Sequence, residues 1–71
     1  MKLYLQDRRK IIDMPKEVWI AGTEKEFFIM GMSYISPVMA TYDNEDVARE
    51  VLNQMFEHYK SGEKCFWLPE K

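Results

Sequence analysis

The hydrophobic and polar positions predict short strands over the first 42 residues. Leu3 and Leu5 alternate with Tyr4, and a period of two is typical of a half-buried strand. The run FFIMGM is apolar, rich in aromatics and flanked by turn residues, which favours a central strand. Pro15 ends another segment because it has no N–H to donate to a sheet. The predicted strands cover residues 2–6, 10–14, 17–22, 27–32 and 38–42.

After Asp43 the apolar residues recur at spacings of three and four, which predicts an amphipathic helix over residues 44–60. Asp43 is the predicted N-cap, and Gly62 suits the left-handed position beyond the helix end. The residues that we expect to be buried against the sheet are Val51, Leu52, Met55 and Phe56.

Residues 65–68 are apolar and aromatic, and Pro69 follows them, which predicts a final short strand. The sequence therefore indicates an α+β fold. A small antiparallel sheet of about five strands is packed by one C-terminal amphipathic helix. We expect residues 1–71 to form a single domain, with a loop at 33–37.

Composition restricts the classes of function. The chain of 71 residues has a net charge of −2, one cysteine and one histidine, so a disulfide framework and a multi-cysteine zinc site are excluded. A single cysteine forms no disulfide within the chain, which favours the reducing environment of the cytoplasm. The opening residues lack the apolar run of a signal peptide, and we expect no membrane span and no generic nucleic-acid binding.

The sequence offers little catalytic chemistry. Cys65 lies beside Phe66 and Trp67 in the predicted last strand, which favours a buried, inert thiol over a nucleophile paired with His58. Four carboxylates near the helix start are explained by capping and by the helix dipole. We therefore expect no enzyme activity, no metal and no cofactor.

The charges are distributed unevenly along the chain. Residues 1–20 carry five basic and three acidic side chains, whereas residues 43–71 carry four basic and seven acidic ones. Arg8, Arg9 and Lys10 follow the first predicted strand. Such a basic turn is either simply solvated or binds a phosphate through its guanidinium groups, beside aromatic rings that stack on a base.

The chain has more large apolar side chains than one helix covers: ten aromatic residues and six methionines. This surplus predicts a homo-oligomer that uses the sheet face or edge bearing Trp19 or Trp67. A pocket between subunits would combine aromatic rings, hydroxyl groups and a guanidinium. The predicted ligand-binding residues are Arg8, Arg9, Trp19, Tyr34, Ser36 and Trp67.

The segment from Tyr42 to Pro69 resembles the C-terminal half of a family of small phage and prophage accessory proteins of Gram-positive bacteria. The shared pattern is Y-[S/D]-x-E-x-A-x-x-V-L, followed by a terminal strand that ends in proline. The matching residues here are Tyr42, Asp43, Glu45, Ala48, Val51, Leu52, Met55, Tyr59, Gly62, Phe66 and Pro69. The resemblance implies a gene on a mobile element and an anti-defence context, and it brings no catalytic residues.

Three functions remain open. The first is a non-enzymatic anti-defence protein that sequesters a nucleotide-type immune signal in a pocket between subunits, which the arginines and the aromatic surplus favour. The second is a protein–protein inhibitor of a host defence enzyme, of the anti-CRISPR or anti-restriction type, which the acidic helix favours. The third is a phage protein with a regulatory or structural role. The expected partners are a second copy and either a nucleotide-derived small molecule or a host protein, in the host cytoplasm.

Overall fold

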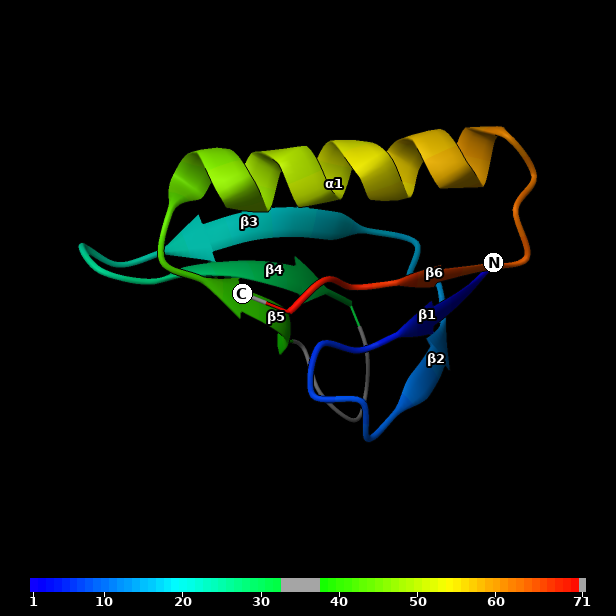
Figure 1. The fold of residues 1–71 in the computed structure, drawn as a ribbon, viewed down its shortest axis with the longest axis horizontal. Helices are drawn as coiled ribbons and strands as arrows, with labels where there is room; N and C mark the ends of the chain where they lie inside the picture. Colours follow the sequence, from blue (N-terminus) through cyan, green and yellow to red (C-terminus); the bar gives the residue numbers. More distant parts are fainter. Residues whose placement is uncertain (33–37, 71) are drawn as a thin grey trace.

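A computed structural model describes residues 1–32 and 38–70, and its element order agrees with the α+β prediction (Figure 1). The predicted loop at 33–37, with Tyr34 and Ser36, lies outside the described residues. The elements are β1 (Lys2–Tyr4), β2 (Ile11–Asp13), β3 (Val18–Gly22), β4 (Phe27–Gly31), β5 (Val38–Tyr42), α1 (Glu45–Lys60) and β6 (Cys65–Trp67).

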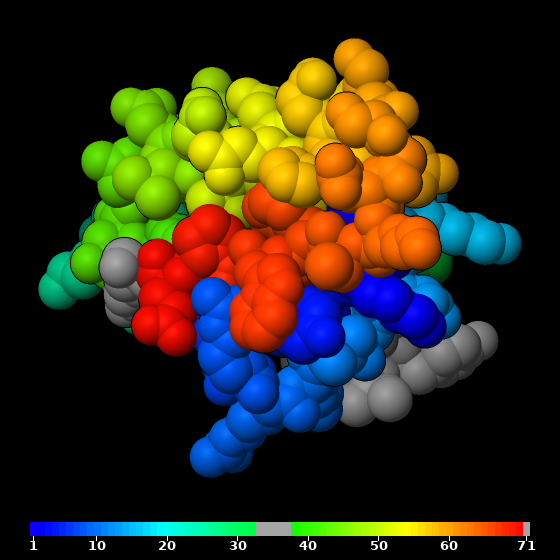
Figure 2. All heavy atoms as spheres, turned by 45° about the vertical axis from the view of Figure 1, so that its right-hand side comes forward, coloured from blue at the N-terminus to red at the C-terminus, as the bar shows by residue number. Residues whose placement is uncertain are grey.

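The strands are divided between two three-stranded sheets, with the orders β2-β1-β6 and β3-β4-β5, where the sequence predicted one sheet. All pairs are antiparallel except β1 with β6, which run parallel with Leu3 opposite Phe66. The alternation within a strand indicates which residues face the core, but it does not identify the neighbouring strand. In Figure 2 the beginning of the chain and the end of the chain lie side by side below the helix.

Gln6 connects the two sheets. Its backbone N–H donates to the Met39 carbonyl at 3.2 Å. Its side chain accepts from the Thr41 N–H at 2.8 Å and donates to the Thr41 carbonyl at 2.9 Å. One side chain therefore pairs with the edge of β5 as a neighbouring strand would.

The N-cap of the helix lies one residue later than predicted. Asn44, and not Asp43, is the N-cap: its Oδ1 accepts from the backbone N–H of Asp46 at 2.7 Å and of Val47 at 3.4 Å. Asn and Asp cap helices about equally well, so the residue types alone did not decide between neighbours. At the other end Gly62 has φ +78°, which confirms the left-handed position predicted for it.

The core lies where α1 packs against β3, β4, β5 and β6, and Figure 1 shows the helix extending along one side of the strands. Of the four helix residues predicted to be buried, Val51 and Met55 are buried and Leu52 is half-buried. Phe56 is 51% exposed, so its predicted burial is wrong. Phe56 lies at the margin of the apolar stripe of α1 and lines an open groove together with Tyr59. The core residues are Leu3, Leu5, Ile29, Met39, Ala40, Tyr42, Ala48, Val51, Met55, Phe66 and Leu68.

The predicted burial of Cys65 is also wrong, because its side chain is exposed. Strand β6 alternates: Phe66 faces the core and is 6% exposed, so Cys65 and Trp67 face outward. The cysteine is therefore accessible to solvent, although it follows the same sequence pattern as a buried strand.

We predict that Met55→Ala lowers the free energy of unfolding by about 2–5 kcal/mol, because it removes a fully buried side chain and leaves a cavity. Phe56→Ala is the matched control on the next helix position, and it should cost less than about 1 kcal/mol. Urea unfolding followed by circular dichroism measures both. Equal losses in the two variants would contradict the packing of α1 described here.

Candidate functional site

The candidate site is built where the first and last strands meet. The parallel register of β1 and β6 places Tyr4 opposite Trp67, on the outer face of that sheet. Their rings stack with centroids 3.9 Å apart and an angle of 5° between the planes. Trp67 remains 53% exposed, so an aromatic surface is held rigidly at the edge of the protein.

Arg8 reaches this surface from the connection between β1 and β2. Its backbone N–H donates to the Leu5 carbonyl at 2.9 Å, and its φ is 61°, a conformation uncommon outside glycine. The guanidinium carbon lies 5.1 Å from the centroid of the Trp67 ring, within the range of a cation–π contact. A strained backbone that directs a cation onto an aromatic ring is typical of functional sites.

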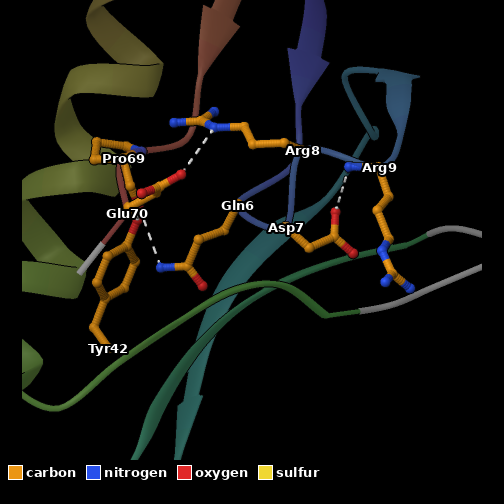
Figure 3. A network of polar contacts seen from close by, with 7 residues as sticks. All are labelled: Gln6, Asp7, Arg8, Arg9, Tyr42, Pro69 and Glu70. Atoms are coloured by element: carbon orange, nitrogen blue, oxygen red, sulfur yellow. Dashed lines mark hydrogen bonds and ion pairs between the residues drawn. The ribbon is translucent and has the colours of Figure 1, made fainter.

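The carboxylate of Glu70 completes the cluster. Its Oε1 lies 3.6 Å from the Arg8 Nε (Figure 3). This distance is longer than a charge-assisted hydrogen bond, which requires about 2.7–2.9 Å. The tail after β6 therefore places an anionic group beside the guanidinium in a loose contact. We name Tyr4, Arg8, Trp67 and Glu70 the Arg8 cluster.

The two predicted arginines do not act together. Figure 3 shows the Arg9 side chain directed away from Arg8 and Glu70. The Arg9 backbone N–H donates to Asp7 Oδ1 at 2.9 Å, which fixes the turn in this orientation. One phosphate therefore meets the two guanidinium groups only if the Arg9 side chain rotates.

Trp19 lies elsewhere, on the face of β3-β4-β5 opposite the helix. Val18 and Ile20 pack against the core, so the strand alternation turns Trp19 to the other face, where it is 41% exposed. Among the described residues no helix or strand packs on that face. The structure thus brings together two predicted ligand residues, Arg8 and Trp67, and separates Arg9 and Trp19 from them.

Sequence reasoning missed Tyr4 and Glu70. The alternation of β1 did place Tyr4 on the face away from Leu3, but only the pairing of β1 with β6 places it on Trp67. Glu70 follows Pro69, and no local pattern connects it with Arg8. Both contacts depend on strand pairing between residues more than sixty positions apart.

A polar network below the cluster holds the C-terminal tail. The Pro69 carbonyl accepts from the Tyr42 hydroxyl at 2.6 Å and from the Gln6 side-chain amide at 3.2 Å (Figure 3). Burial raises the pKa of Tyr42 to about 12, although the nearby positive charge of Arg8 acts in the opposite direction. Since the tail carries Glu70, this network also positions the carboxylate beside Arg8.

His58, which the sequence offered as a partner for Cys65, contacts a backbone carbonyl and an aromatic ring. His58 Nδ1 lies 2.8 Å from the Gln54 carbonyl oxygen, and its ring meets Phe66 edge-on at 4.8 Å. Within residues 1–32 and 38–70, no three His, Cys, Asp or Glu side chains are placed to hold a metal ion. In the same residues no helix has the length and hydrophobicity to cross a membrane.

In comparisons with known proteins, no family model, curated protein or solved structure matches this chain.

The raised pKa of Tyr42 predicts a specific loss of stability in alkali. An unfolded tyrosine ionises near pH 10 and the folded one near pH 12, so the contribution of Tyr42 is complete below pH 10 and is lost as the pH rises to 12. The stability difference between the wild type and Tyr42→Phe should therefore shrink by about 1 kcal/mol between pH 9 and pH 11. Urea unfolding of both proteins at each pH measures it. A difference that stays constant over this range would show that Tyr42 ionises like a free tyrosine.

Proposed function

We propose that this protein is a non-enzymatic binding protein that sequesters a nucleotide-type ligand at the Arg8 cluster. The supporting observation is the convergence of a guanidinium and an exposed, preorganised tryptophan ring from two distant segments. The cluster is an open surface, so in this proposal a second copy closes over the ligand, as expected for a pocket between subunits.

The chemistry of the cluster fits the two parts of a nucleotide. A base stacks on the face of Trp67 that Tyr4 does not cover, and a phosphate takes the place of the Glu70 carboxylate beside Arg8. Arginine suits this role because its planar fork binds two oxygens of one phosphate. The Glu70 contact is loose and exposed, so a ligand anion displaces it at little cost.

The resemblance to phage accessory proteins suggests the biological setting of this proposal. A protein that only binds would lower the free concentration of a nucleotide immune signal in the host cytoplasm. Such a protein works stoichiometrically and needs tight binding, because each signal molecule must be held and not converted.

We expect Arg8→Ala to weaken nucleotide binding by about tenfold to a hundredfold, which corresponds to one charge-assisted contact. Glu70→Gln should strengthen binding, because it removes the carboxylate that competes with the phosphate. Calorimetric titration with a panel of cyclic dinucleotides and ADP-ribose derivatives measures both effects.

Arg49→Ala is the matched control, since Arg49 is an exposed arginine on α1, paired with Glu45 at 3.5 Å and outside the cluster. It should leave binding unchanged. No heat with any nucleotide in the panel would refute the proposed function, whereas binding that survives Arg8→Ala would retain the function and discard this site.

A second candidate, an inhibitor of a host defence enzyme, is favoured by the uncovered face of β3-β4-β5. Four apolar residues share this face and do not pack against the core. Trp19 is exposed, and the other three, Ala21, Phe28 and Met30, are half-buried. A contiguous apolar face that is open to solvent is typical of a protein-binding surface.

In this second case Trp19→Lys should remove the effect of the protein on host defence in an infection assay, because a charge is placed in the apolar face. Arg8→Ala should leave that effect intact. The opposite pattern would exclude the inhibitor and favour the nucleotide proposal.

A further inference from the structure

Strand β3 has a free edge. It is the outer strand of the sheet β3-β4-β5, and among the described residues no strand pairs with its other side (Figure 1). Its sequence, VWIAG, contains neither a charge nor a proline. Proteins usually protect edge strands with charges, prolines, bulges or a covering segment. At the opposite edge of this sheet, Gln6 supplies such a cover for β5.

The register with β4 shows which backbone groups of β3 face outward. Bonds from Met32 N–H to the Glu17 carbonyl and from Thr23 N–H to the Glu26 carbonyl mark the hydrogen-bonded pairs at both ends of the ladder. These pairs alternate along an antiparallel ladder, so Trp19 and Ala21 bond to β4. The residues that turn their N–H and C=O groups away from β4 are therefore Val18, Ile20 and Gly22.

Apolar surface lies on both sides of this edge. On the open face Trp19 is exposed, as described above. On the helix side a groove of about 490 Å³ begins at Val18 and is lined by Phe56 and Tyr59, which are both more than half exposed. A strand added to β3 would shield apolar side chains above and below the new ladder.

We propose that β3 pairs antiparallel with β3 of a second copy about a two-fold axis at Ile20. In this register Ile20 faces Ile20 of the second copy, and Val18 faces Gly22. All three outward-facing residues then exchange N–H and C=O bonds, and two three-stranded sheets become one six-stranded sheet. The contact is isologous, because each copy offers the same strand.

The charges beside β3 fit this register. The bends that flank β3 carry Lys16 at one end and Glu24 at the other, so the two-fold axis brings Lys16 of one copy beside Glu24 of the second copy, and Glu24 beside Lys16. Both residues are exposed, and the ion pairs described within one copy do not include them. The two-fold axis thus creates two complementary contacts between oppositely charged groups.

None of the residues of the Arg8 cluster belongs to β3 or to its flanks, so this interface leaves the cluster uncovered. The copy that closes over a bound nucleotide in the proposed function therefore uses a different surface. The inference therefore goes beyond the proposed function and stands independently of it. A failure of nucleotide binding would be seen by calorimetry, whereas a failure of self-pairing would be seen in the mass of the protein without any ligand.

The first test uses sedimentation equilibrium at micromolar concentration. The wild type should have twice the 8.6 kDa mass of one chain. Lys16→Glu and Glu24→Lys should each raise the dimer dissociation constant by about tenfold, since each turns two attractive contacts into two repulsive ones. The double variant Lys16→Glu/Glu24→Lys should restore the wild-type value, because it exchanges the charges and keeps them opposite.

The second test is amide hydrogen exchange by NMR under the same conditions. The Val18, Ile20 and Gly22 amides should be protected and should lose protection on dilution. Trp19 and Ala21 are the internal controls, because β4 protects them in either state. A mass of 8.6 kDa, a dimer with rapid exchange at the three outward amides, or a double variant as weak as the single ones would each overturn the pairing. If the β3 edge instead pairs with a strand of another protein, the purified protein alone would have the mass of one chain, 8.6 kDa.

Discussion

The parallel pairing of β1 with β6 joins the two ends of the chain, and the candidate site depends on it. Parallel neighbours require a long connection between them. Here that connection contains the sheet β3-β4-β5 and the helix. The same register buries Leu3 and Phe66 on the inner face and places the half-buried Tyr4 and the exposed Trp67 on the outer one. One ladder therefore contributes to the core and forms the aromatic surface.

The elements of the fold were predictable because they depend on local patterns. The alternation of Leu3, Tyr4 and Leu5 and the helical stripe from Val47 to Tyr59 each lie within one segment, and the structure confirms both elements. The division into two sheets was not predictable, since it depends on which strands pair. The exposure of Phe56 has a similar origin, because the extent of the surface beneath the helix is a property of the assembled sheets.

The candidate site was predictable in its residue types and not in its geometry. Arg8 and Trp67 carry chemistry that the sequence displays directly. Their contact depends on a left-handed turn at Arg8 and on strand pairing, and neither has a strong local signal. For Cys65 the apolar character of its neighbours favoured burial, whereas the alternation of β6 around the buried Phe66 exposes it. Periodicity was the better guide there, because side-chain direction in a strand is set by geometry.

The Gln6 side chain limits how many copies of the protein can join edge to edge into one sheet. A sheet with two open edges can add copies without limit and form a fibre, whereas a sheet with one open edge stops when that edge is used. Gln6 bonds to both backbone groups of Thr41 and so closes the β5 edge. If two copies join at β3, each outer end of the combined sheet is already capped by its own glutamine. The combined sheet would then end at six strands, although the strand that joins the two copies is uncharged and apolar.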